Sequence, residues 1–331
     1  MKRDLEGRSV VITGASSGIG RAAAVAFAKR GANVALAARR ADLLQEVARE
    51  CQSLGVHAIA VPTDVTDAGA MRDLAQAAER AFGSIDVWIN NAGTGVFGPY
   101  QNADIELHRR TIEVNLLGSM HGAYAVLPLF LRRGRGILIN NISLAGWAPT
   151  PFASAYTASK FGLRGFAASL RQELGDHPDI HVCGVFPAII DTPGLDHGAN
   201  VSGRQINPGP LIYAPEDVAE TFVSLVRWPR DEVAVGWPAR AAQVAYAVAP
   251  GPTEHLMGAF VRRGLRRAER APRTEGALLR TVPTGRGVSG GWRDAKNLPH
   301  SARQTSTALG LALTAGILLL IGTKGLARAR R

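Results

Sequence analysis

The chain has 331 residues, and its 38 Lys+Arg against 27 Asp+Glu give a formal net charge of +11. The excess lies in the last quarter, because residues 1–250 carry 23 basic and 23 acidic side chains whereas residues 251–331 carry 15 and 4. This distribution argues against a uniformly basic nucleic-acid-binding protein and indicates a neutral globular body followed by a cationic tail. The two cysteines, Cys51 and Cys183, fit neither a disulfide framework nor a zinc spacing, so we expect a reducing compartment. We predict no metal site.

Short β-rich runs alternate with helical stretches over the first 236 residues. The predicted strands are Ser9–Thr13, Asn33–Ala37, Val56–Val61, Ile85–Asn90, Gly136–Ile142, His181–Phe186 and Glu232–Gly236. The predicted helices are Arg21–Arg30, Leu43–Leu54, Ala70–Phe82, Thr111–Leu131, Ala155–Leu174 and Pro215–Arg227. Apolar strands that alternate with helices are typical of a parallel sheet covered on both faces. We therefore predict an α/β fold with a doubly wound parallel sheet of Rossmann type and about seven strands.

A helical, membrane-associated extension is expected after this α/β region. Thr253–Arg270 predicts an amphipathic helix with arginines on one face; its apolar face is made by Leu256, Met257, Phe260, Val261 and Leu265. Such a helix either lies on an anionic bilayer surface or packs on the protein with its basic face in water. Residues 271–306 are rich in Pro, Gly, Arg and Thr and are expected to form a linker.

Gln304–Thr323 contains 20 residues without a charge. As a helix it would span roughly 30 Å, the thickness of a hydrocarbon core. We predict a membrane segment here, with a buried or oligomerising helix as the alternative. Basic residues flank it on both sides, so the positive-inside rule does not fix its orientation. No signal peptide is expected at the N-terminal end, where the apolar run is too short.

A glycine-rich segment, Thr13–Gly20, joins the first predicted strand to the first helix. Its glycines would let the backbone approach a pyrophosphate, and a helix N-terminus offers free N–H groups to phosphates; an ordinary glycine-rich turn is the alternative. The second strand ends at Arg39-Arg40, with no acidic residue to hold a ribose 2′-hydroxyl. Arg39 can instead pair with a 2′-phosphate, which favours NADP over NAD, unless both arginines are solvated surface charges.

Tyr156 and Lys160 lie four residues apart on a predicted helix and therefore share one face. A cation about 4–5 Å from a phenol, at an effective dielectric near 20, would lower the phenol pKa by about 2–3 units. Tyr156 could then exchange protons near neutral pH, as a carbonyl reduction or alcohol oxidation requires. Ser143 follows the fifth strand, at the sheet edge where ligands bind, and its hydroxyl can hold a substrate oxygen.

Together these features resemble the short-chain dehydrogenase/reductase family over about residues 7–236. The resemblance rests on several motifs in order at the family's spacing: Thr13–Gly20, Asp64-Val65, Asn90-Asn91-Ala92-Gly93, Asn115, Ser143, Tyr156, Lys160, and Pro187 followed by Thr192. Two positions depart from the pattern. Ala188 stands where a glycine is usual, and Ser17 stands where some NADP-preferring members carry a second basic residue.

The resemblance implies hydride transfer between NADP(H) and a carbonyl or secondary alcohol. Tyr156 is then the acid/base, Ser143 orients the reacting oxygen, and Asn115 holds a water in the proton relay. Lys160 binds the nicotinamide ribose and lowers the Tyr156 pKa. The implied cofactor-binding residues are Thr13, Gly14, Ser16, Ser17, Gly18, Ile19, Gly20, Arg39, Asp64, Val65, Asn91, Ala92, Gly93, Tyr156, Lys160, Pro187 and Thr192. A homo-oligomer is also implied.

The expected organisation has four parts: an NADP-binding catalytic domain over residues 1–250, a basic amphipathic helix and linker over 251–303, a membrane segment over 304–323, and a basic tail over 324–331. Attachment to a membrane favours a lipophilic substrate, and NADP supply places the catalytic domain on the cytoplasmic side. A flexible lid over the substrate is expected at Ile189–Tyr213.

Two other functions remain open. The core could be a catalytically silent nucleotide-binding regulatory or scaffold protein at the membrane, although such a protein has no need of an acid/base. The arginine-rich residues 251–306 could bind nucleic acid, but only two aromatic side chains are interleaved there for stacking on bases. We therefore expect no nucleic-acid partner.

Overall fold

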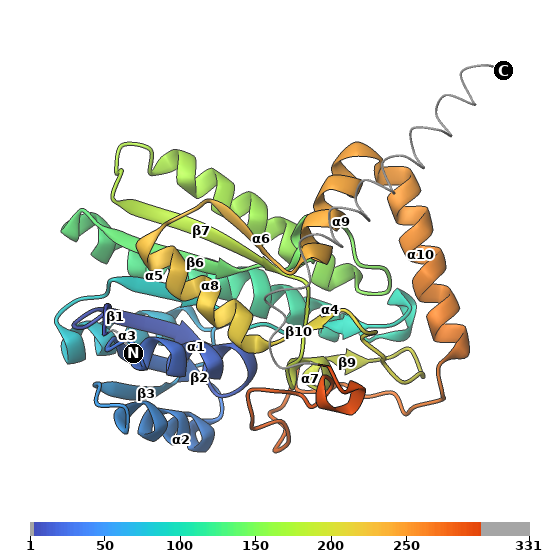
Figure 1. The fold of residues 1–331 in the computed structure, drawn as a ribbon, viewed down its shortest axis with the longest axis horizontal. Coiled ribbons are helices and arrows are strands. Elements are labelled where there is room, and N and C mark those ends of the chain that lie inside the picture. Colours follow the sequence, from blue (N-terminus) through green and yellow to red (C-terminus); the bar gives the residue numbers. More distant parts are fainter. Residues whose placement is uncertain (1–2, 299–331) are drawn as a thin grey trace.

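A seven-stranded, fully parallel sheet forms the centre of the protein (Figure 1). The computed structural model describes residues 3–298, so the predicted segments 304–323 and 324–331 lie outside the described residues. The strands follow the order β11-β7-β6-β4-β1-β2-β3. Their bounds are β1 Ser9–Thr13, β2 Asn33–Ala38, β3 Ala58–Pro62, β4 Val87–Asn90, β6 Gly136–Asn141, β7 Ile180–Pro187 and β11 Glu232–Val235. The predicted doubly wound sheet is thereby confirmed.

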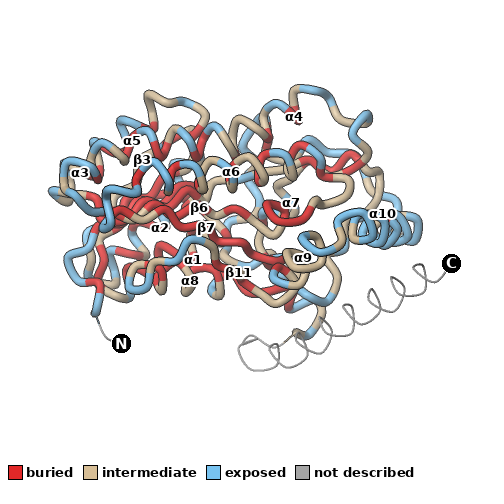
Figure 2. The backbone as a smooth tube through the Cα atoms, turned by 90° about the horizontal axis from the view of Figure 1, so that it is seen from above, coloured by how far each residue is buried: buried red, intermediate tan, exposed pale blue. Residues whose placement is uncertain are grey.

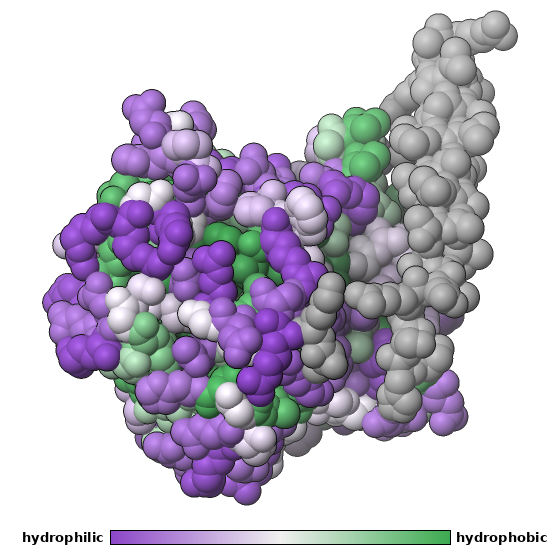
Figure 3. Space-filling view, turned by 60° about the vertical axis from the view of Figure 1, so that its left-hand side comes forward, coloured by the Kyte–Doolittle hydropathy of each residue, from purple (hydrophilic) through white to green (hydrophobic). Residues whose placement is uncertain are grey.

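Helices cover both faces of this sheet. One apolar cluster joins it to α1 (Gly18–Ala28), α2 (Ala41–Gln52) and α8 (Pro215–Arg227). A second cluster joins the opposite face to α3 (Ala68–Phe82), α5 (Gly118–Arg133) and α6 (Ser154–Glu173). The central strands β1 and β4 are buried throughout and β2 is buried except at its two end residues (Figure 2), which explains their continuous apolar sequences. The outer face seen in Figure 3 is mostly hydrophilic, with apolar patches of limited extent.

One predicted helix has a different internal structure from the expected one. The helix expected over Thr111–Leu131 is longer and consists of α4 (Ile105–Ile112), a π-helical turn at Glu113–Leu117, and α5. By length and composition, Ile105–Arg133 is the one described helix apolar enough to cross a membrane. Its α5 part packs against the sheet and α3 through residues such as Phe130, which identifies that part as a core helix.

The expected lid is tied to the body by short strands. β8 (Ile189–Ile190) pairs with β10 (Ile212–Tyr213), and β9 (Ala199–Asn200) pairs with β5 (Val96–Phe97). A single helical turn, α7 (Gly194–His197), lies between β8 and β9. The lid is therefore a structured segment in which backbone pairing restrains both ends.

Two helices project from one end of the molecule, α9 (Trp237–Val248) and α10 (Pro250–Arg267) (Figures 1 and 2). The apolar residues expected on a single face of α10 differ in their exposure. Val261 and Leu265 are half-buried beside the buried Gly258, whereas Leu256 and Phe260 are 67% and 76% exposed. The helix therefore packs Val261 and Leu265 on the protein and leaves Leu256 and Phe260 exposed.

The described part of the expected linker is not a free linker. Residues 274–293, which we name the strap, run back along the body beside α7 (Figure 1). Thr274 forms an antiparallel bridge with Asn200, so the strap adds to the β5–β9 pair. The strap contains few apolar residues, and this composition suggested a linker. Backbone hydrogen bonds, which composition does not reveal, hold the strap on the body instead.

Candidate active site

The glycine loop lies between β1 and α1, at the carboxyl edge of the sheet where strand order reverses. Gly14 and Gly18 have positive φ values of 66° and 57°, which favour glycine. A Cβ atom on Gly14 would lie 2.9 Å from the Ala92 Cα, and one on Gly20 would overlap the Gly14 carbonyl. A Cβ atom on Gly18 would lie 3.2 Å from the Thr192 Cβ. These glycines are thus required by close packing in the structure itself.

Thr13 and Asn91 join the glycine loop to the residues after β4. The Thr13 Oγ1 accepts hydrogen bonds from the backbone N–H groups of Asn91 (2.9 Å) and Ala92 (3.1 Å). The Asn91 side-chain amide donates to the Thr13 carbonyl at 2.9 Å and accepts from Asn141 at 2.9 Å. These contacts bring the two predicted cofactor motifs together at one place.

The N-terminus of α1 points its backbone donors into this region. Ser17 caps α1 in an extended conformation without a side-chain bond to the helix backbone, and Ile19 is partly buried. The Arg40 guanidinium donates to Ser17 Oγ at 2.9 Å and to Ser16 Oγ at 3.3 Å. Arg40 therefore stands beside position 17, where the expected second basic residue is absent. The sequence left open whether Arg40 is a solvated surface charge, and its place directly after β2 and Arg39 was the signal that it lies at the site.

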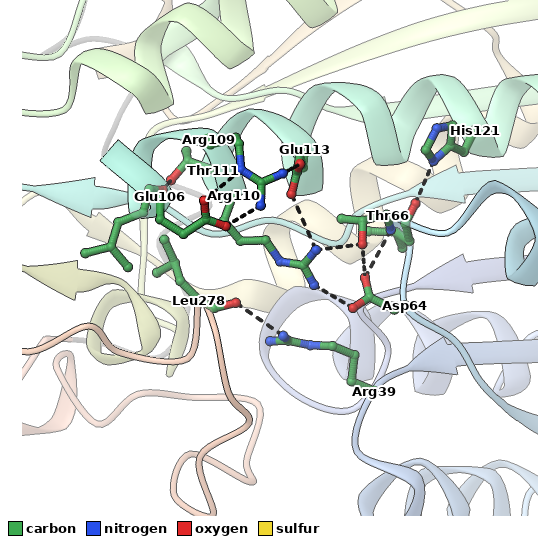
Figure 4. Close-up of polar contacts among 12 residues, drawn as sticks. Arg39, Asp64, Thr66, Glu106, Arg109, Arg110, Thr111, Glu113, His121 and Leu278 are labelled. Atoms are coloured by element: carbon green, nitrogen blue, oxygen red, sulfur yellow. Dashed lines mark hydrogen bonds and ion pairs between the residues drawn. The ribbon is translucent and has the colours of Figure 1, made fainter. Parts of the chain in front are cut away.

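Arg39, Asp64 and Arg110 gather at the ends of β2, β3 and α4 (Figure 4). Asp64 accepts from Arg110 at 2.6 Å and from the Thr66 N–H and hydroxyl at 3.0 and 2.8 Å. Burial raises the pKa of Asp64, but these hydrogen bonds and the Arg110 charge outweigh burial, so its pKa lies below the ordinary value. Val65 is buried, and its carbonyl contacts His121. Sequence reasoning missed Arg110.

Tyr156 and Lys160 lie one turn apart on α6, as predicted from their spacing. The Lys160 Nζ lies 5.6 Å from the centre of the Tyr156 ring and donates to the Asn141 carbonyl at 2.9 Å. The Tyr156 hydroxyl shares a hydrogen bond with Ser143, whose φ of 137° is unusual for a residue other than glycine. A Cβ atom on Gly95 would lie 3.1 Å from the Tyr156 ring, so this glycine leaves room for the phenol.

The expected direction of the Tyr156 pKa shift is wrong in this structure. Burial raises the pKa of Tyr156, and the hydrogen bond with Ser143 opposes the increase only in part. Burial also lowers the pKa of Lys160 to about 7. Removing both groups from water penalises each charged form, and burial is the largest cause of both shifts.

Asn115 lies inside the π-helical turn of the long helix. Its side-chain oxygen accepts from the Thr94 N–H at 2.8 Å, and its amide donates to the Thr94 carbonyl and to Ser159 Oγ, both at 2.9 Å. Gly93 lies beside Asn115 and Lys160, since a Cβ atom added to it would lie 3.4 Å from Asn115 Oδ1 and 3.8 Å from Lys160 Nζ. π-Helical turns occur frequently at functional sites, and this one places Asn115 beside the Tyr156–Lys160 pair.

Pro187 and Thr192 complete the set predicted from the sequence. Pro187 ends β7 opposite Val235, and Thr192 packs on Gly18. The residue between them that sequence reasoning missed is Asp191, which is 1% exposed. Its carboxylate accepts hydrogen bonds from the strap, at Ser289 Oγ (2.7 Å) and at the Trp292 N–H (2.9 Å). No local pattern in the sequence connects residues about a hundred positions apart.

Trp147, which follows β6 and the turn at Leu144–Gly146, belongs to the core. It is 3% exposed and stacks on Phe186 with ring centres 3.8 Å apart. Val96 is also buried, in a small cluster that includes Leu278 of the strap. Phe97 is half-buried beside Phe152, at 6.4 Å between ring centres.

Comparison with known proteins matches residues 8–199 to the family model described as short chain dehydrogenase. The chain is 32% identical over 330 residues to the uncharacterized oxidoreductase YxnA of Bacillus subtilis (strain 168), covering 97% of this chain and 92% of YxnA. It is 39% identical over 223 residues to 11-beta-hydroxysteroid dehydrogenase A of Sesamum indicum, covering 67% of this chain and 61% of that protein.

A solved structure shares the fold at a TM-score of 0.62 and 29% identity, covering 69% of this chain and 95% of the other. It is an alcohol dehydrogenase from the archaeon Thermococcus sibiricus, complexed with 5-hydroxy-NADP.

Proposed function

This chain belongs to the short-chain dehydrogenase/reductase family, and we propose that it transfers a hydride between NADP(H) and a carbonyl or secondary alcohol. The main observation in support of this function is that Ser143, Tyr156 and Lys160 lie together beside the glycine loop, at the carboxyl edge of the sheet. The tight packing at Gly14 and Gly18 fits a backbone that closely approaches a pyrophosphate. NADP(H), when bound, would supply or accept the hydride.

In the reduction direction, Tyr156 donates its phenolic proton to the substrate oxygen as the carbonyl carbon receives the hydride. Its raised pKa keeps the phenol protonated at neutral pH, which suits this role as an acid. Ser143, already hydrogen-bonded to the phenol, holds the same oxygen. The proton lost from Tyr156 is replaced from solvent, so one carbonyl, one hydride and one proton give one alcohol.

Lys160 and Asn115 support this proton transfer. Lys160 holds the nicotinamide ribose, and its amino group with a pKa of about 7 can pass protons at neutral pH. We assign the water of the proton relay to Asn115, because the Asn115 side chain and the Lys160 amino group both lie next to Gly93. Its bonds to Thr94 also fix the loop that follows β4.

Preference for NADP over NAD is assigned to Arg39 and Arg40. Their guanidinium groups lie at the end of β2 and beside Ser17, and no carboxylate follows β2 directly. Asp64, paired with Arg110, and Val65 are assigned to the adenine end. The NADP derivative bound to the archaeal alcohol dehydrogenase supports this choice of cofactor.

A lipophilic substrate and a membrane location are part of the proposal. Leu256 and Phe260 of α10 are exposed next to exposed arginines, a combination suited to an anionic bilayer surface. The hydroxysteroid named for the sesame relative supports a lipophilic substrate. We propose the same four parts of the chain, with boundaries after residues 250, 303 and 323. The catalytic domain is placed on the cytoplasmic side, where NADP is supplied.

A homo-oligomer is proposed through α5. Leu117, Met120, Tyr124 and Leu131 form an exposed apolar stripe at helical spacing on and next to this helix. An apolar stripe of this kind is matched by a second copy of the same surface.

The test is an NADPH-oxidation screen of ketones and aldehydes, including lipid extracts, with the detergent-solubilised full-length protein. Tyr156→Phe should reduce turnover by roughly 10²–10⁴-fold, because the general acid is lost, while the Kd for NADPH stays within about twofold. Unchanged turnover in this variant would remove Tyr156 from the mechanism. NADPH binding by a folded wild-type protein without turnover of any substrate would favour the scaffold alternative.

A further inference from the structure

The strap follows the proposed dinucleotide site from one end to the other. Ala277 and Leu278 lie at Arg39, at the adenosine end. Gly287 lies at Gly18, over the N-terminus of α1. Ser289 and Gly290 lie at Asp191, next to Thr192 and the proposed nicotinamide end. The three contacts occur in the order in which a bound dinucleotide would be met.

Two buried anchors fix the strap. Leu278 is 1% exposed and packs with Val96, Leu107 and Val201, whereas its neighbour Leu279 is 41% exposed. At the other anchor, the buried Asp191 carboxylate accepts from Ser289 Oγ and from the backbone of residues 290, 292 and 293. An apolar pocket and a buried carboxylate therefore specify this position for the strap.

Next to and between the anchors, strap carbonyls occupy donors that the proposed function assigns to phosphates. The Gly18 N–H, at the start of α1, donates to the Gly287 carbonyl at 3.0 Å. Arg40 donates to the Thr284 carbonyl at 3.0 Å and to the Gly285 carbonyl at 3.3 Å. Arg39 donates to the Ala277 carbonyl at 2.7 Å. Neutral carbonyl oxygens thus stand where anionic phosphate oxygens would be bound.

We propose that the strap is an internal competitor of NADP(H), which closes the dinucleotide site and is displaced when the cofactor binds. The proposal rests on the assignment of Gly18, Arg39 and Arg40 to the cofactor under the proposed function. Phosphate bonds to guanidinium and helix N-terminal donors are charge-assisted and stronger than those to carbonyls, so the cofactor can win this exchange. The apparent Kd is raised in proportion to the closed fraction.

The experiment loosens the strap in the full-length protein and measures NADPH binding by fluorescence titration. Leu278→Ala should lower the Kd for NADPH by about 5–50-fold, because the open fraction increases. Leu279→Ala is the matched control and should leave the Kd within about twofold of wild type. Ser289→Ala removes one hydrogen bond at the other anchor and should also lower the Kd for NADPH. This second variant tests the proposal if Leu278→Ala impairs folding.

Hydrogen exchange gives a readout independent of activity. NADPH bound to the wild-type protein should accelerate exchange at the amides of Gly290, Trp292 and Arg293, which donate to Asp191 while the strap is closed, whereas the Gly18 amide stays protected.

Each outcome bears on the proposal. A weaker Kd in the loosened variants, together with slower exchange at the amides of Gly290, Trp292 and Arg293 when NADPH binds, would overturn it and make the strap a wall of the cofactor site. Equal Kd values would overturn it and leave the proposed function intact. Absence of NADPH binding in wild type and variants alike would overturn the proposed function together with the strap proposal.

Discussion

Lys160 brings an amino group into the interior beside Tyr156, and this has a cost in stability. Burial lowers its pKa from 10.5 to about 7, so between these values the folded protein binds fewer protons than the unfolded chain. By linkage, stability increases with pH across this window. Below about pH 7 both states hold the proton and the full penalty of burying a charge applies. The residue is therefore retained at the expense of stability, as is usual at functional sites.

This penalty predicts the pH dependence of unfolding in the absence of NADP(H). The Lys160 contribution should increase stability by about 2 kcal/mol from pH 7 to pH 9. Lys160→Met, which keeps the length of the side chain without the charge, should be more stable than wild type at pH 7 and should lack this increase. Denaturant unfolding of both proteins at several pH values checks the difference. Parallel pH profiles would show that Lys160 is not buried as described.

The two cysteine thiols limit the pH range over which stability should increase. Burial raises the pKa of Cys51 to about 12 and that of Cys183 to about 11, from an ordinary 9.0. Above pH 9 the unfolded chain loses these protons first, so stability should fall again. The comparison of Lys160→Met with wild type cancels this contribution, since both proteins contain the cysteines.

Tyr156 leads to a second prediction at the level of single residues. Because its pKa is raised above 10, the phenol stays protonated throughout neutral and moderately alkaline pH. The kcat/KM for carbonyl reduction should therefore stay level from about pH 8 to about pH 10, and alcohol oxidation, which needs the phenolate, should increase with pH over the same range. Initial rates in both directions check this. A fall in reduction centred near pH 8 would contradict a raised pKa.

Among the elements, α10 is the one whose exposed side chains suggest a surface contact. Leu256→Glu with Phe260→Glu should abolish binding to anionic phospholipid vesicles by a protein truncated after residue 298, because the apolar contact is lost and repulsive charge is added. His255→Glu with Ala259→Glu adds the same number of carboxylates at other exposed positions of α10 and serves as the control. Vesicle flotation at two salt concentrations measures the effect. Equal loss in both variants would assign the binding to charge alone.

The elements also show where the sequence was informative. β1 and α8 begin and end where the alternation of apolar runs predicts, because burial determines which residues a strand or helix can contain. The first turns of α1 and α2 were missed by two or three residues, since helix N-termini carry little apolar signal. The π-helical turn around Asn115 was not predicted at all, because nothing in the local composition distinguishes it from regular helix.

Whether a contact in the site could be predicted depended on how far apart its residues lie in the sequence. Tyr156 and Lys160 are neighbours on one helix, so their spacing alone placed them together. Arg40 at Ser17 and Ser289 at Asp191 are tertiary contacts between residues far apart in the chain, and their partners could not be inferred from periodicity. The direction of the Tyr156 pKa shift was wrong for a related reason: burial depends on the whole fold.

At the scale of the whole molecule, the α5 stripe predicts the oligomeric state. The protein should form dimers or larger oligomers in solution, and Met120→Glu with Tyr124→Glu should shift it toward the monomer, because charges would be placed in an apolar interface. Trp228→Glu, at an exposed tryptophan outside α5, is the control and should not change the mass. Light scattering after gel filtration measures both. An unchanged mass in the α5 variant would assign the contact to another surface.

The contact between Arg21 and Arg286 spans 265 positions of the chain. At a synthesis rate of about 5–20 residues per second, the glycine loop is made roughly 13–50 s before its strap. The strap is therefore the last part of the proposed cofactor site to be made, after Arg39, Tyr156 and Thr192. The order of translation would thus let the strap close over the loop only after the rest of that site has been made.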